Sequence, residues 1–155
     1  MKGHPDVIAQ LQRLLANELA AIDQYFIHSR MYEDWGYLKL FERIDHETTE
    51  EKDHASMLIR RMLFLEATPD LSQRDGLRVG ATVPRMLAND LQLEYDVAAA
   101  LKEAIVCCER EQDFQTRQVL EQLLRDTEED HAYWLEQQLR LIEQVGLQNY
   151  LQAQM

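Results

Sequence analysis

The stretch ETTEEKDHASM, residues 47–57, decides the fold. It continues an apolar stripe in which Leu40, Ile44, Glu51, His54 and Leu58 follow one another at helical spacing. Glu51 and His54 are therefore predicted to share the buried face of a helix. A carboxylate and an imidazole in a helical core need a chemical reason, because a buried charge is costly unless it is paired.

The same pattern recurs in three other segments. Glu18 lies on the apolar stripe of the first predicted helix, Glu94 on that of the third, and Glu128 with His131 on that of the fourth. Each predicted helix thus contributes a core carboxylate, and two of them add a histidine.

The few prolines and glycines of the chain predict four long helices. We expect them over residues 6–35 and 40–65, from about Pro84 to the EREQDF segment, and from there to Gly146, with a short fifth helix in residues 147–155. The connection of residues 67–84 is the only long one. Short, long and short connections describe an all-α four-helix bundle with one long crossover, and we expect one domain over residues 1–155.

The composition limits the class of partner. Sixteen basic and twenty-eight acidic residues give a formal net charge of −12, which argues against nucleic acid and anionic membranes and favours cations. No apolar run has the length of a signal peptide or a membrane span, so we expect a cytoplasmic protein. Cys107 and Cys108 are adjacent, which disfavours a mutual disulfide and a thiolate metal site, so we expect reduced thiols.

The acidic positions form an internal repeat. The two E-x-x-H motifs are 77 residues apart, and Glu18 and Glu94 are 76 apart. About half an E-x-x-H match is expected by chance, so either motif alone is weak evidence, but matching carboxylates on the other two helices favour a metal site. Four buried glutamates balance two divalent cations, and mixed oxygen and imidazole ligation suits iron or manganese. We predict a pair of iron ions.

One interval breaks this repeat. From the single Glu to the E-x-x-H motif there are 33 residues in the first half and 34 in the second, so the second interval is one residue longer. By the family resemblance described below, we expect the additional residue in the fourth helix near Thr127. A local π-bulge is expected to absorb it. Choosing Glu129 as the ligand would lose the i+3 relation to the histidine, so the prediction keeps Glu128.

Other residues near these motifs have simpler interpretations. Tyr25, on the face of Glu18, is predicted to be a core tyrosine bonded to a buried acid rather than a redox participant. Trp134 is predicted to pack in the core, and His4 and His28 to lie at the surface or at an interface.

A second cation site remains open at the start of the quoted stretch. His46 and Glu50, together with Glu47, form either a solvated ion pair or an accessory iron site.

Several stretches resemble the bacterioferritins, and the resemblance covers the whole chain: NELAAIDQYFIHSRMYEDWG (17–36), FLE (64–66), TEEDHAYWLEQQL (127–139) and GLQNYLQAQM (146–155). It implies a ferritin-like bundle whose di-iron centre takes one Glu from each of two helices and Glu-x-x-His from each of the other two. It also implies a cage of twenty-four subunits around an iron mineral, with the C-terminal helices at the fourfold axes. The implied ferroxidase ligands are Glu18, Glu51, His54, Glu94, Glu128 and His131.

The expected function is iron storage, with Fe²⁺ oxidised by dioxygen or peroxide at the di-iron centre. A di-iron or dimanganese oxidase or catalase acting on a small molecule is an alternative, and the size of the assembly separates it from a cage. A structural bundle or haem carrier is a second alternative, which the content of bound iron separates.

Lys52 stands where bacterioferritins typically carry the methionine that binds haem between two subunits. A protonated lysine has no lone pair for iron, and deprotonating it at pH 7 costs about 4.6 kcal/mol. Met57 lies five residues further, about 140° around the helix. We therefore expect a homopolymer without haem, and co-assembly with a methionine-bearing sister subunit as the source of haem sites.

Overall fold

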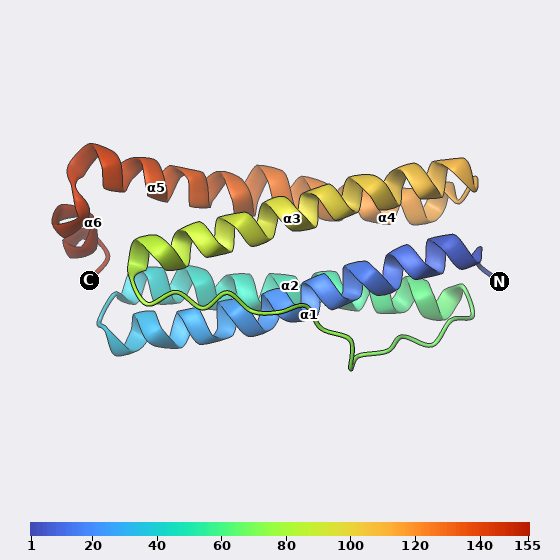
Figure 1. Ribbon diagram of the computed structural model, residues 1–155, viewed down its shortest axis with the longest axis horizontal. Helices are drawn as coiled ribbons and strands as arrows, with labels where there is room; N and C mark the ends of the chain where they lie inside the picture. Colours follow the sequence, from blue (N-terminus) through green and yellow to red (C-terminus); the bar gives the residue numbers. More distant parts are fainter.

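The computed structural model describes all 155 residues and contains helices without strands. The helices are α1 (Pro5–Asp34), α2 (Leu38–Phe64), α3 (Val83–Arg110), α4 (Phe114–Arg125), the π-helix η1 (Asp126–Ala132), α5 (Tyr133–Val145) and α6 (Leu147–Ala153). The predicted fourth helix consists of α4, η1 and α5, which follow one another without a break (Figure 1). The predicted all-α bundle with a short C-terminal helix is confirmed.

The helix ends follow capping chemistry. His4, exposed as predicted, and Thr82 cap α1 and α3 by accepting hydrogen bonds from backbone N–H groups of the first turn. Gly36 and Gly146 adopt φ of 84° and 83° after α1 and α5, a region that glycine enters without steric cost. These residues place the turns where the sequence predicts them.

The bundle consists of two hairpins (Figure 1). In one, α1 packs antiparallel to α2; in the other, α3 packs against α4, η1 and α5. The long connection runs along the outside of the bundle from one end to the other, so that α2 and α3 are parallel. It is the predicted crossover, and it leaves the two chain ends at opposite ends of the bundle.

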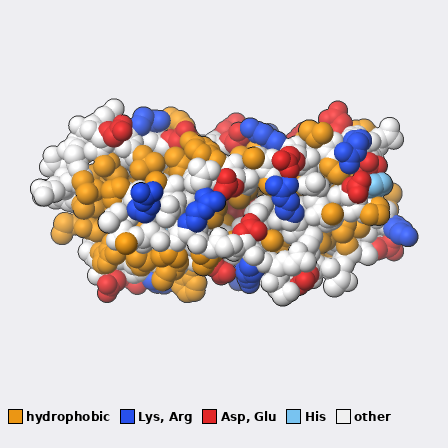
Figure 2. All heavy atoms as spheres, viewed as in Figure 1, with side chains coloured by type: hydrophobic (Ala, Val, Ile, Leu, Met, Phe, Trp, Pro, Cys, Tyr) orange, Lys and Arg blue, Asp and Glu red, His pale blue; other side chains and the backbone are white.

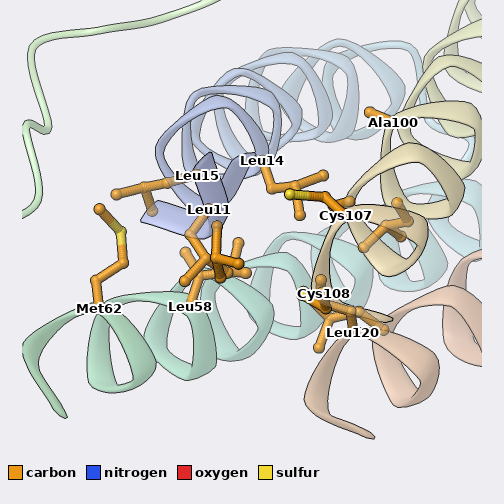
Figure 3. Packing of buried hydrophobic residues seen from close by; sticks show 14 of the residues in the cluster. Leu11, Leu14, Leu15, Leu58, Met62, Ala100, Cys107, Cys108 and Leu120 are labelled. Carbon is orange, nitrogen blue, oxygen red and sulfur yellow. The ribbon is translucent and has the colours of Figure 1, made fainter. Parts of the chain in front are cut away.

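Two apolar clusters fill the interior. One, near the N-terminal end of α1, contains Leu11, Leu58 and Leu120 together with both cysteines (Figure 3). The other contains tyrosines, leucines and valine from the opposite half of the bundle. Cys107 and Cys108 are free thiols, as expected, and burial raises the pKa of Cys108 to about 12.

The surface mixes charged and apolar side chains, and Figure 2 shows hydrophobic groups between acidic and basic ones on the viewed face. Large exposed apolar side chains include Phe26 and Ile27 on α1, Trp35 directly after α1, and Leu77 and Val79 on the crossover. No helix has both the length and the apolar character needed to cross a lipid bilayer.

Candidate metal centre

A layer of polar side chains lies between the two apolar clusters. Glu18, Glu51, His54, Glu94 and His131 meet there, and each is at most 4% exposed. They come from α1, α2, α3 and η1, where each lies on the apolar stripe of its helix. Five residues that the sequence analysis singled out are therefore brought together.

Glu18, Glu51 and His54 form the first half of the centre. The Nδ1 atom of His54 lies 3.8 Å from Oε2 of Glu18 and 3.6 Å from Oε2 of Glu51. The three residues each offer one ligand atom within 4.8 Å of the other two. This spacing suits a single metal ion.

Glu51, Glu94 and His131 form the second half. The Nδ1 atom of His131 lies 2.8 Å from Oε1 of Glu51 and 3.4 Å from Oε1 of Glu94. The imidazoles of His54 and His131 stack with 5.7 Å between ring centroids. Since Glu51 belongs to both halves, the geometry is that of two adjoining cation sites with one shared carboxylate.

The predicted core position of Glu128 is wrong. Its side chain is 45% exposed and lies 3.1 Å from the ammonium of Lys102. The cause is η1, which confirms the predicted π-bulge near Thr127. A π-helix bonds i to i+5, so the spacing of residues on one face widens by about one residue. Thr127, only 1% exposed, consequently shares the buried face with His131, whereas Glu128 and Glu129 point outward.

Burial and neighbouring charges set the protonation of the centre. Burial raises the pKa of Glu18 well above its usual range and that of Glu94 to about 7, and the charge of Glu51 adds to both shifts. Burial favours neutral imidazoles, but the surrounding carboxylates outweigh it, raising the pKa of His54 to about 11 and that of His131 above its usual range. Protonated histidines therefore balance the carboxylates at neutral pH, and metal ions have to displace these protons.

The donor set fits divalent cations. Among the five inner residues of the centre, four buried atoms have no partner in hydrogen-bonding geometry: Oε2 of Glu18, Oε1 of Glu51, and Nδ1 of His54 and of His131. Buried polar atoms are normally satisfied, so these four point to a missing partner of opposite charge. Carboxylate oxygen with imidazole nitrogen is a ligand set that iron and manganese accept.

The Nε2 atoms of both histidines point away from the centre and also meet carboxylates. The Nε2 atom of His54 lies 3.0 Å from Oδ2 of Asp126. The Nε2 atom of His131 lies 2.8 Å from Oε2 of Glu47 and 2.5 Å from Oε2 of Glu50. Each imidazole is thus held between inner and outer carboxylates.

The predicted accessory residues are only partly brought together. Glu47 and Glu50 lie within 4.8 Å of each other and of Asp130 and His131. His46 contacts Glu50 alone, at 2.8 Å, and remains at the surface.

A guanidinium already neutralises part of this acidic group. The Nε atom of Arg43 lies 2.7 Å from Glu47, and one of its terminal nitrogens lies 2.8 Å from Asp130. The guanidinium also lies 4.8 Å from the ring centroid of Trp134, which is half-buried and packs as predicted.

Tyr25 makes the predicted contact with a buried acid. It is fully buried, and its hydroxyl donates a hydrogen bond to Oε1 of Glu94. This bond occupies one oxygen of Glu94 and fixes the orientation of its carboxylate.

The predicted surface position of His28 is wrong, because its side chain is fully buried. Its Nδ1 atom lies 2.8 Å from Oδ1 of Asp90, and its Nε2 atom accepts a hydrogen bond from the N–H of Gly80 on the crossover. Gln24 donates to the same oxygen of Asp90. Asp90 stands four residues before Glu94, and this spacing is the signal in the sequence that marks their shared face of α3.

Comparison with known proteins places this centre in a family. The profile described as "Ferritin-like domain" matches residues 8–145. The chain is 67% identical over 155 residues to "Bacterial ferritin" of Synechocystis sp., covering 100% of this chain and 99% of that protein. It is 59% identical over 154 residues to "Bacterial ferritin" of Pseudomonas aeruginosa, with 99% of each chain covered. Identity to "Bacterioferritin" of Mycobacterium leprae is 41% over 150 residues, covering 97% of this chain and 94% of that protein. A bundle of this topology with paired carboxylate and histidine sites, matched over nearly its whole length, belongs to the ferritin-like family and within it to the bacterioferritins.

Proposed function

We propose that this protein stores iron and oxidises Fe²⁺ to Fe³⁺ at the buried centre. The observation that carries the proposal is the pair of carboxylate and histidine triads that share Glu51. A site rich in negative charge holds Fe³⁺ more strongly than Fe²⁺ and so favours loss of an electron. Dioxygen or peroxide is the proposed acceptor of these electrons.

The residues divide the work between two ions. Glu18 and His54 would hold one Fe²⁺, Glu94 and His131 the other, and Glu51 would lie between them. Tyr25 keeps Glu94 oriented through its hydrogen bond. Glu128 is left out of this set, because it pairs with Lys102 outside the centre.

Aerobic oxidation of Fe²⁺ tests the proposal. Addition of Fe²⁺ to the metal-free protein should give a rapid rise in the absorbance of Fe³⁺. The double variant Glu94→Ala, His131→Ala should lose this fast phase, whereas Glu33→Ala, an exposed control, should retain it. An unchanged rate in the double variant would contradict the assignment.

An accessory iron site is proposed at His46, Glu50 and Glu47. Glu50 supports it, because its carboxylate contacts the exposed His46 through one oxygen and the buried His131 through the other. Its position between surface and centre suits an ion in transit.

We further propose that the homopolymer binds no haem. Lys52 is exposed on α2, and Met57 lies five residues further along the helix, where it packs against the first apolar cluster. Protein produced with abundant haem should lack a stoichiometric Soret band, and Lys52→Met should create one. A strong band in the unmodified homopolymer would refute the proposal.

We also propose assembly into a cage of twenty-four chains, which the family membership supports. The exposed apolar side chains of α1 and the crossover support contacts with further copies. Twenty-four copies of an 18.3 kDa chain should elute at roughly half a megadalton, whereas a simple bundle enzyme would elute near a dimer. Co-assembly with a methionine-bearing sister subunit and localisation in the cytoplasm remain predictions from the sequence.

A further inference from the structure

We infer that Asp126 is a positioning residue for His54, a role that rests on the proposed metal centre. Its carboxylate accepts a hydrogen bond from Nε2 of His54 and thereby turns Nδ1 toward Glu18 and Glu51. Asp126 does not itself enter either group of inner ligands.

The geometry of His54 supports this role. Its ring is almost fully buried, and its Nε2 atom lies 3.0 Å from Oδ2 of Asp126. On the opposite edge of the ring, Nδ1 faces the carboxylates of Glu18 and Glu51 and has no hydrogen-bond partner. Asp126 is the one residue that bonds the outer edge of this ring.

The chemistry of imidazole makes the outer contact consequential. A neutral imidazole carries a free lone pair on one ring nitrogen and a proton on the other. A hydrogen-bond acceptor beside one nitrogen holds the proton there and so leaves the lone pair on the other nitrogen. With the proton held on Nε2 by Asp126, the lone pair of His54 is on Nδ1, where a cation between Glu18 and Glu51 would meet it. Such outer carboxylates fix both tautomer and orientation of metal-binding histidines.

The π-helix explains why Asp126, and not Glu128 of the E-x-x-H motif, is the acidic residue of this segment that bonds His54. Asp126 is the first residue of η1, and the wider turn that sends Glu128 outward begins there. Its side chain is 40% exposed and lines an open pocket of about 260 Å³, to which Asp53, Met57 and Gln122 also contribute. The bond from Asp126 to His54 therefore lies between this pocket, which His54 also lines, and the inner carboxylates Glu18 and Glu51.

His131 provides an internal comparison. Its outer nitrogen meets two carboxylates, Glu47 and Glu50, whereas the outer nitrogen of His54 meets Asp126 alone. If one outer carboxylate is removed, Nε2 of His131 still has a carboxylate partner, whereas Nε2 of His54 has none. The half of the centre with Glu18 and His54 should consequently be the more sensitive one.

Binding of Co²⁺ to the metal-free protein tests the inference without turnover. Calorimetry gives the affinity of each site, and the visible ligand-field bands report the environment of the bound ion. Asp126→Ala should weaken one of two Co²⁺ sites by about 10- to 100-fold and alter its bands, while the other site stays within about twofold. Asp126→Asn keeps an oxygen acceptor without the charge and should lie between Asp126→Ala and the unmodified protein.

Asp53→Ala is the matched control, because it removes one negative charge from the same pocket and the carboxylate of Asp53 makes no hydrogen bond or ion pair with either histidine. Its two sites should stay within about twofold of the unmodified protein. Equal affinities and spectra for Asp126→Ala and Asp53→Ala would overturn the inference while leaving the proposed function intact. An unmodified protein that fails to bind two Co²⁺ per chain would instead overturn the proposed centre. Helical content measured by circular dichroism checks that each variant is folded. If Asp126→Ala does not fold, Asp126→Asn still tests the inference.

Discussion

The same four-residue motif has opposite consequences in α2 and in η1. In α2, Glu51 and His54 both point inward, because residues three apart share a face of a regular α-helix. In η1, His131 points inward but Glu128 is exposed beside Lys102. The E-x-x-H spacing therefore brings both side chains to the buried face only where the backbone keeps the α-helical pitch.

The two halves of the centre differ accordingly in where their carboxylates originate. The half with His54 takes its carboxylates from α1 and α2. The half with His131 takes Glu51 from α2 and Glu94 from α3, and none from its own helix. Glu51 is thus the one carboxylate that belongs to both halves.

Removing the shared carboxylate should have the largest effect. Glu51→Ala takes a ligand from both sites, so the initial rate of Fe²⁺ oxidation should fall by about 100-fold or more. Co²⁺ at about one hundred times its Kd should stabilise the unmodified protein by about 2.7 kcal/mol per site, and this gain should be absent from the variant. Thermal unfolding with and without Co²⁺ measures it. A variant that still binds two ions would show that the halves are independent.

A change at Glu94 should have an intermediate effect that depends on pH. Burial, reinforced by Glu51, raises the pKa of Glu94 from 4.5 to about 7 in the folded protein. Between these two pH values the folded state binds the additional proton, so the free energy of unfolding of the metal-free protein falls as pH rises. The loss from this group is on the order of 3 kcal/mol.

Glu94→Gln should remove that part of the pH dependence. Unfolding by urea at pH 4.5 and pH 7.5, in the presence of a chelator, should show the variant gaining stability relative to the unmodified protein at the higher pH. The exposed Glu33→Gln should follow the unmodified protein at both. A constant difference between Glu94→Gln and the unmodified protein would mean that Glu94 is not held protonated by its burial.

Changing the outward glutamate of η1 should have the smallest effect. Glu128→Ala breaks an exposed ion pair with Lys102, a class of interaction worth about 0–1 kcal/mol. We expect an initial oxidation rate within about twofold of the unmodified protein, measured as for Glu51→Ala. A loss as large as that of Glu51→Ala would instead mean that η1 turns this carboxylate inward when iron binds.

Much of the centre could be predicted because four of its five inner residues lie on regular α-helices. A three- or four-residue spacing on such a helix fixes the direction of a side chain relative to its apolar neighbours, as it does for Glu18 and Glu94. The extra residue of the fourth helix was visible as a longer interval. The sequence did not show which side chain would leave the buried face, because that depends on the residue at which the π-helix begins.

The burial of His28 could not be predicted for a different reason. Its partners, Asp90 and Gly80, are 62 and 52 residues away along the chain. Only the packing of α1 against α3 and the path of the crossover bring them to the same place. A histidine between Ile27 and Ser29 shows none of this in its local sequence.

The contacts between α1 and α3 have a mechanical consequence. The hydroxyl of Tyr25 bonds Glu94, and one turn before Glu94 on α3 the carboxylate of Asp90 bonds both Gln24 and His28 of α1. These hydrogen bonds lie next to one another between α1 and α3. A shift of either helix along its axis by one residue would break all of them. The bonds therefore fix the position of α1 along α3, and with it the placement of Glu18 on α1 relative to Glu94 on α3.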